Sequence, residues 1–299
     1  MRQGAKRALE FLFTRGGIAR WVNPRPGDAL VLAYHNIRPD DAAPSGDQPL
    51  HLTFSRFRDQ LDRLYDRCDV VPLAEVLDSA RGSRPRVAIT FDDAYDGALT
   101  LGVSEVVERG LPATIFVTPA FLDGQSFWWD ALAGTDGLAE SVRGRALDEL
   151  RGEDRAIRNW AASGGLAPSE PPADCRGAAE GDLARAAASP GITIGSHTWS
   201  HPNLARLDGA ELAAELERPL TWLGERFGKV IPWLSYPYGR WSPTVAAAVE
   251  RAGYKAALRV DGGWNRSGRD STFSIPRLNV PAGISGDGFS LRLGGLFCT

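Results

Sequence analysis

Short apolar runs alternate with amphipathic segments along most of this chain. Runs rich in β-branched residues predict buried strands, and apolar residues spaced three and four apart predict helices that cover them. Strands are expected at residues 29–35, 69–72, 86–91, 112–118, 191–197, 231–237, 254–260 and 274–280. This alternation is typical of an α/β fold built on parallel strands.

Amphipathic segments fill the spaces between these runs. A helix beginning near residue 54 would place four apolar side chains on one face, those of Phe54, Phe57, Leu61 and Leu64. Further helices are expected over about 97–109, 208–227 and 243–251. Residues 120–190 break the alternation and contain no clear strand, so we interpret them as a mostly helical insertion with one flexible loop.

The composition is that of an ordinary globular protein. The chain has 299 residues, 43% apolar and 24% charged, and its net charge of −3 leaves no basic footprint for nucleic acid. Three cysteines far apart argue against a disulfide framework and a cysteine-based zinc site. One barrel domain, residues 28–282, is expected between an N-terminal segment (1–27) and a C-terminal tail (283–299).

The N-terminal segment is basic and carries apolar residues around Phe11. Its longest apolar run is too short for the hydrophobic region of a signal peptide, and no stretch approaches the ~20 residues of a spanning helix. Two interpretations stay open: an amphipathic helix that makes weak contact with anionic lipid, and a helix docked on its own domain. We therefore expect a cytoplasmic protein, with a peripheral position at the inner membrane face as the alternative.

The segment TFDDAYDG, residues 90–97, places two adjacent carboxylates at the end of an apolar strand. Active sites of α/β barrels lie at these strand ends. Adjacent residues there point in different directions, so one carboxylate could bind a metal while the other handles a proton. The alternative is that Asp92 or Asp93 caps the following helix.

The segment SHTWSH, residues 196–201, also follows a predicted strand. Its spacing brings His197 and His201 to one side if the segment makes a helical turn. Two imidazoles and one carboxylate form a common hydrolytic zinc site that leaves a position open for water. Two of only four histidines fall here at ligand spacing.

These two motifs, together with SYPYG at residues 235–239, resemble the NodB-homology polysaccharide deacetylases over roughly residues 28–282. The resemblance implies an α/β fold, a distorted (β/α)7 barrel with the helical insertion at about 120–190. It also implies removal of acetyl groups from an N-acetylated oligo- or polysaccharide.

The resemblance assigns roles to individual residues. Asp92 would be the catalytic base. The metal ligands would be Asp93, His197 and His201. The backbone N–H of Tyr238 would help to hold the oxyanion. Zinc is the expected ion, although nickel, cobalt and iron also suit this donor set.

The chain departs from the family pattern at two points. No histidine follows His201, and Ser235 and Tyr236 stand where the third motif usually has an arginine. Both departures resemble the circularly permuted poly-N-acetylglucosamine deacetylases, whose acidic histidine ends an N-terminal strand. LAYHN matches that ending, so His35 is the expected general acid, with a histidine that is only hydrogen-bonded at a strand end as the alternative. Arg277 is expected to pair with Asp92 in place of the motif arginine, with a surface arginine as the alternative.

Other polar and aromatic positions carry less specific expectations. Asp261 and Trp264 resemble the loop in which the family places an aspartate that tunes the catalytic histidine, with a turn aspartate and a packed tryptophan as the alternative. Trp128, Trp129 and Asp130 either line the sugar cleft or pack in the core. His51 is interpreted as structural.

Three functions are therefore weighed for this chain. The first is a metal-dependent N-deacetylase, which needs an acid to protonate the leaving amine. The second is an esterase that removes O-acetyl groups from xylan or a similar glycan with the same groups. The third is a non-catalytic carbohydrate-binding barrel. The glycan and the oligomeric state do not follow from the residues.

Overall fold

A computed structural model of the protein describes residues 28–78, 84–265 and 271–296, so the expected amphipathic segment at 1–27 lies outside the described residues. The strands are β1 (Ala29–Tyr34), β2 (Asn36–Arg38), β3 (His51–Thr53), β4 (Asp69–Val70), β5 (Arg86–Phe91), β6 (Ala113–Val117), β7 (Ile192–Ser196), β8 (Val230–Ser235), β9 (Ala256–Leu258) and β10 (Leu278–Asn279). The α-helices are α2 (Phe54–Arg67), α3 (Ser104–Glu108), α4 (Trp128–Ala131), α5 (Glu140–Asp148), α6 (Asp154–Ser163), α7 (Glu180–Ala188), α8 (Gly209–Arg226), α9 (Pro243–Arg251) and α10 (Gly286–Leu293). A π-helix, η4 (Ala98–Val103), runs directly into α3.

The main sheet is parallel and curls on itself in the strand order β10-β1-β5-β6-β7-β8-β9, with β4 also pairing with β5. The segment before β10 brings the two ends together. Ile275 exchanges backbone hydrogen bonds with Ala257 and Arg259 beside β9, and three residues later Leu278 pairs with Leu32 of β1. The expected distorted α/β barrel is thereby confirmed.

Alternation along the strands divides the apolar side chains between two sides of the sheet. Val31, Ala88, Phe116 and Trp233 form one cluster from four different strands, which fills the inside of the curl. Their sequence neighbours join the larger cluster beneath the helices, as Leu30 and Leu32 do with Leu61 of α2. Because side chains alternate with a period of two, a strand buried on both faces reads as one continuous apolar run.

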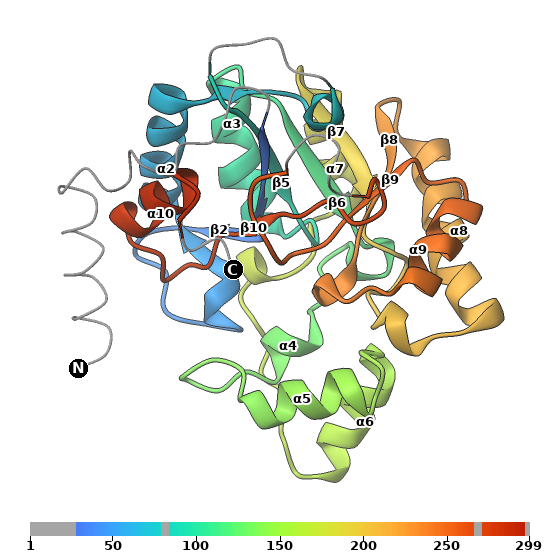
Figure 1. The fold of residues 1–299 in the computed structure, drawn as a ribbon. Helices are drawn as coiled ribbons and strands as arrows, with labels where there is room; N and C mark the ends of the chain where they lie inside the picture. Colours follow the sequence, from blue (N-terminus) through green and yellow to red (C-terminus); the bar gives the residue numbers. More distant parts are fainter. Residues whose placement is uncertain (1–27, 79–83, 266–270, 297–299) are drawn as a thin grey trace.

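The helices lie outside the sheet and the insertion gathers below it (Figure 1). Helices α4, α5 and α6 form this lower group, whereas α7 packs against β7 as a barrel helix. The expected C-terminal tail contains α10, which contacts α2 through a hydrogen bond from Arg63 Nη1 to Ser290 Oγ of 3.0 Å. Within the described ranges, no helix has the length and apolar character needed to cross a bilayer.

Candidate active site

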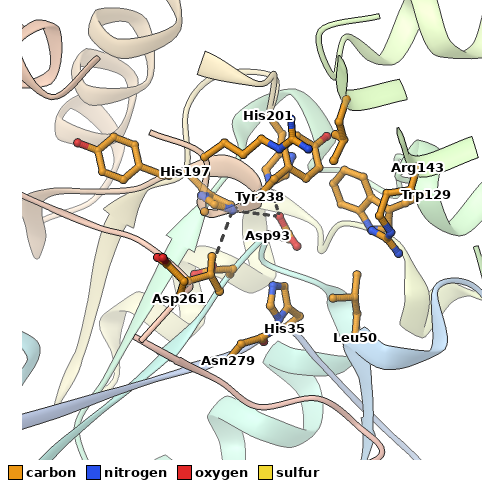
Figure 2. A pocket seen from close by; sticks show the side chains of 16 residues that line it. His35, Leu50, Asp93, Trp129, Arg143, His197, His201, Tyr238, Asp261 and Asn279 are labelled. Carbon is orange, nitrogen blue, oxygen red and sulfur yellow. Dashed lines mark hydrogen bonds and ion pairs between the residues drawn. The ribbon is translucent and has the colours of Figure 1, made fainter. Parts of the chain in front are cut away.

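A cavity of about 410 Å³ opens at the carboxyl ends of the strands. Its lining brings together all the residues expected to be catalytic or metal-binding except Arg277, namely His35, Asp92, Asp93, His197, His201, Tyr238 and Asp261. Figure 2 shows the side chains of His35 and Asn279 on one side of this cavity and those of Trp129 and Arg143 on another. Parallel strands end at a common edge, and for that reason residues far apart in the chain meet here.

Asp93, His197 and His201 present three ligand atoms to one another. Nε2 of His197 and Nε2 of His201 lie 3.0 Å apart, and they lie 3.5 Å and 3.4 Å from Oδ1 of Asp93. Donor atoms about 2.0–2.1 Å from a tetrahedral ion lie about 3.3 Å from one another. The three side chains therefore form a candidate metal site at the spacing of such an ion.

The surroundings of these donors also fit a divalent cation. Oδ1 of Asp93 is buried and has no hydrogen-bond partner among the described residues. Burial raises the pKa of Asp93 well above its ordinary value, and the charges of Asp92 and Asp130 raise it further. Burial lowers the pKa of His201 well below its ordinary value, which favours the neutral imidazole that binds metals. A buried carboxylate without a compensating charge is costly, and a cation at this position would compensate it.

The outer partner of His197 settles which of its ring nitrogens faces the site. Nδ1 lies 2.8 Å from the backbone oxygen of Ser235. A carbonyl oxygen only accepts, so Nδ1 carries the proton and Nε2 is left with a lone pair toward Asp93 and His201. A hydrogen bond to the other ring nitrogen is the usual arrangement around a metal-binding histidine.

The loops that carry the site have strained backbones. Seven non-glycine residues in the described ranges have positive φ, and five of them lie in the three site loops: Asp93, Ala94, Thr198, His201 and Tyr238. Left-handed conformations cost about 1–3 kcal/mol each for such residues and persist only where the surroundings hold them. Strained residues of this kind cluster at active sites, so their gathering in three loops around one cavity fits a functional site.

On the inner side of the cavity, Asp92 forms an ion pair with Arg277. Arg277 donates to both of its carboxylate oxygens, at 2.8 and 2.7 Å, and Ser235 Oγ donates to Oδ2 at 3.1 Å. Burial alone would raise the pKa of Asp92, but the charges of Arg277 and His197 bring it well below its ordinary value. Asp92 is therefore ionised, and the contact expected between Arg277 and Asp92 is present.

His35 lines the same cavity from the end of β1. Desolvation lowers the pKa of His35 to about 4, and the nearby charge of Arg277 lowers it too, while Asp92 opposes both. The imidazole is thus neutral near pH 7 in the free protein.

Tyr238 lies in the turn η8 (Pro237–Gly239) after β8, with φ of 57°. The hydrogen bonds that close this turn come from the N–H groups of Gly239 and Arg240, so neither of them uses the N–H of Tyr238. The ring of Tyr238 lies edge-on to that of His201, with 4.5 Å between centroids, and its hydroxyl accepts a hydrogen bond from Trp128. The side chain thereby supports the site while the backbone amide stays available.

The contacts of Asp261 and Trp264 do not match the loop that the family resemblance suggested. Asp261 lines the cavity, yet its exposed carboxylate pairs with Arg259 at 2.8 Å, and no described contact joins it to His35. Trp264 packs against the core and is not part of the cavity lining. A role for Asp261 in tuning His35 stays a prediction.

The insertion contributes one wall through Trp129, whose ring centroid lies 4.9 Å from that of His201. Trp128 and Asp130 are buried and are not part of the cavity lining. Asp130 accepts hydrogen bonds from Tyr95 Oη at 2.7 Å and from the backbone of Asp47 at 2.8 Å, and its Oδ1 lies 3.0 Å from His51 Nε2. Tyr95 Oη in turn accepts from the indole of Trp129 at 2.7 Å.

Sequence reasoning missed Tyr95 as part of this network. The only signal for it was its place within TFDDAYDG. That signal is not specific, because an aromatic residue close to a site motif suggests packing as readily as positioning. His51 joins the barrel to the insertion through Asp130 and is not part of the cavity lining, and its structural role stays a prediction.

Known proteins share parts of this sequence and its fold. A family model described as polysaccharide deacetylase matches residues 79–257. The Bacillus subtilis protein named "Putative polysaccharide deacetylase YxkH" is 29% identical over 100 residues, which span 33% of this chain and only 35% of that protein. Streptococcus pyogenes deacetylase PplD in complex with acetate has a TM-score of 0.61 at 16% identity, over 90% of this chain and 99% of that one. IcaB from Ammonifex degensii has a TM-score of 0.59 at 17% identity, over 91% and 99%.

Proposed function

The chain belongs to the polysaccharide deacetylase family, and on that premise we propose that it is a metal-dependent hydrolase that removes acetyl groups from N-acetylated sugar units. The observation that carries the proposal is one cavity that contains the triad of Asp93, His197 and His201, the ionised Asp92 and the imidazole of His35. Amide hydrolysis needs all three: charge stabilisation, a base and an acid.

Asp93, His197 and His201 would hold the ion, and zinc suits two imidazoles and a carboxylate. Such an ion supplies Lewis acidity, which polarises an acetyl carbonyl and lowers the pKa of water. The protein supplies the remaining chemistry with its own groups.

Asp92 acts as the base in this proposal. Its carboxylate is ionised because Arg277 compensates its charge, and it lies within the cavity where a water molecule attacks the acetyl carbon. The N–H of Tyr238 donates to the carbonyl oxygen as negative charge develops on it. One such donor is typically worth ~3–4 kcal/mol in the transition state.

His35 donates the proton to the leaving amine. Because its pKa is about 4 in the free protein, the ring must gain its proton during the reaction. Negative charge that develops on the substrate in the same cavity raises the pKa of His35, and the proton taken by Asp92 from water is available for transfer. This coupling ties the acid step to formation of the tetrahedral intermediate.

The low pKa of His35 also favours a second candidate, hydrolysis of O-acetyl esters on a glycan such as xylan. An alkoxide leaves more readily than an amine and depends less on an acid. The same base and the same ion site would serve that reaction, so the two candidates differ in the substrate and not in the site.

The test is acetate release from N-acetylglucosamine oligomers and from acetylated xylan, with chelator-stripped protein and after zinc is restored. Asp92→Asn is the matched control, since it keeps the three ligands and removes the base. Zinc-dependent release from the amino sugar by the wild type alone would support the proposal. Release from xylan alone would replace it with the esterase, and a stoichiometric zinc complex inactive on both would contradict hydrolysis of either substrate.

A further inference from the structure

The segment between the two histidine ligands is held from outside the cavity. Thr198 has φ of 66° and His201 has φ of 60°, and neither is a glycine. Inside the loop, Thr198 Oγ1 accepts a hydrogen bond from the N–H of His201 at 3.0 Å. That single bond leaves the N–H groups of Trp199 and Ser200 without a partner inside the loop, so their acceptor must come from elsewhere.

Glu215 of α8 supplies that acceptor. Its Oε2 accepts from the N–H of Trp199 at 3.0 Å and from the N–H of Ser200 at 2.9 Å. Its Oε1 accepts from Ser200 Oγ at 2.6 Å. Both carboxylate oxygens are therefore committed to the loop. Among the described residues, no ion pair to an arginine, lysine or histidine competes for them.

The loop has further contacts with its neighbours. The guanidinium of Arg218, one turn after Glu215, lies 3.3 Å from the centroid of the Trp199 ring. The backbone oxygen of Trp199 accepts from the N–H of Ala120 at 3.0 Å. Hydrogen bonds to a charged acceptor are about twice as strong as neutral ones, so the contacts with Glu215 are the strong part of this arrangement.

Helix α8 does not depend on Glu215 for its own position. Leu212, Leu216 and Leu223 are buried on its inner face, and Tyr254 Oη donates to the backbone oxygen of Leu216 at 2.8 Å. The carboxylate of Glu215 thus links the loop to a helix that is anchored by its own contacts with the barrel.

We propose that Glu215 is the positioning residue of the metal site, holding the strained segment 198–201 so that Nε2 of His197 and Nε2 of His201 converge on Oδ1 of Asp93. The inference rests on the metal site of the proposed function and adds to it a residue outside the cavity. It predicts that the loss of the carboxylate loosens the ligand geometry and leaves the barrel folded. Outer partners of metal ligands typically contribute 10–100-fold to affinity.

The test is zinc affinity in the full chain, measured by competition with a chromogenic chelator and independently of turnover. Glu215→Ala should raise the dissociation constant for zinc ~10–100-fold. Glu215→Gln keeps an acceptor without the charge and should show a smaller increase. Glu217→Ala, on the exposed side of the same helix, is the matched control and should bind zinc as the wild type does.

A second readout separates positioning from general destabilisation. Thermal unfolding of the metal-free proteins should change little between wild type and Glu215→Gln, while the visible absorption of the Co²⁺-loaded variant should shift with the ligand geometry. Zinc binding by Glu215→Ala within about twofold of wild type would overturn the inference and leave the proposed function standing. If Glu215→Ala does not fold, wild-type affinity in Glu215→Gln overturns it instead. A wild-type chain that binds no zinc would remove the metal site itself.

Discussion

At the residue scale, Asp92 and Asp93 are neighbours in the chain with opposite acid–base behaviour. Arg277 keeps the pKa of Asp92 well below its ordinary value against the effect of burial. Burial keeps the pKa of Asp93 well above its ordinary value. Groups whose surroundings push their pKa values apart can take different chemical roles. Here one carboxylate is stabilised as an anion by Arg277, whereas the surroundings of the other disfavour its anion unless a cation is bound beside it.

Replacing Arg277 tests this division of roles. Arg277→Met removes the only charge that donates to both oxygens of Asp92 within the described residues, so the buried anion loses its compensation. Removing one partner of a buried ion pair typically costs about 3–5 kcal/mol. We therefore expect a fall of this size in the free energy of unfolding, which urea unfolding would measure. The pKa of Asp92 should rise, and the acidic limb of the pH–rate profile should move to higher pH. An unchanged acidic limb would show that Asp92 is not the group that must be ionised.

Replacing His35 tests the acid. His35→Ala should lower amide hydrolysis by ~10²–10⁴ because the leaving amine loses its proton donor. Ester hydrolysis by the same variant should fall less, and zinc content should stay at the wild-type level because His35 is not one of the three candidate ligands. Rates are compared on N-acetyl and O-acetyl substrates of the same sugar. Equal losses on both substrates, or a loss of only a few-fold on the amide, would remove His35 from this role.

At the element scale, the insertion completes the cavity that the barrel begins. Helix α4 contributes Trp129, and α5 contributes Arg143 and Leu147 to the lining. Asp130 fastens this group to the barrel, since its donors Tyr95 and Asp47 lie outside the insertion. A carboxylate that is buried and accepts several hydrogen bonds holds its neighbours in a defined geometry. The orientation of Trp129 is therefore decided by the junction between two elements.

Removing the hydroxyl of Tyr95 tests this junction. Tyr95→Phe takes away the acceptor of the Trp129 indole and one donor to Asp130, so KM for the sugar should rise several-fold while zinc affinity stays unchanged. Tyr34→Phe is the control, because it removes an equally buried hydroxyl that donates to Gln60. Both variants should lose about 1–3 kcal/mol of stability, but only the first should change KM. Equal KM values in the two variants would contradict the junction.

At the scale of the whole molecule, folding gathers three histidines of low pKa into one cavity. Burial is the main cause of the lowered pKa values of His35, His197 and His201. Each stays neutral in the folded protein at a pH at which the unfolded chain would already bind a proton. Acidification therefore works against the fold through these residues.

The effect of His35 on stability can be measured by itself. Its folded pKa of about 4 lies below the ordinary 6.5, so the unfolded chain binds the extra proton between these values. Its contribution is complete above pH 6.5 and is lost as the pH falls toward 4. Relative to His35→Gln, chelator-treated wild type should lose at most about 3 kcal/mol of unfolding free energy between pH 7 and pH 4. A difference between the two proteins that stays constant over this range would contradict the lowered pKa.

The sequence by itself determined the strands of the main sheet and the groups that lie close together in the chain. It did not reveal β2 and β3, which pair with each other where no strand was expected. The alternation that sets each strand is local, and so are Asp92 beside Asp93 and the spacing of His197 and His201, which is why these were accessible to prediction. The contact of Arg277 with Asp92 was also expected, although 185 residues separate the two. The family usually has an arginine in its third motif, this chain lacks it there, and Arg277 was expected to take its place.

Only the tertiary structure decided which distant groups meet. The packing of α8 against β7 places Glu215 against the loop that carries His197 and His201, and the docking of the insertion on the barrel buries Asp130. Neither Glu215 nor Asp130 carries a local pattern that reveals these contacts. In the folded chain Asp261 pairs with Arg259 and makes no described contact with His35. The physical reason is that hydrogen bonding and desolvation act through space, so their outcome depends on the packing of the whole chain.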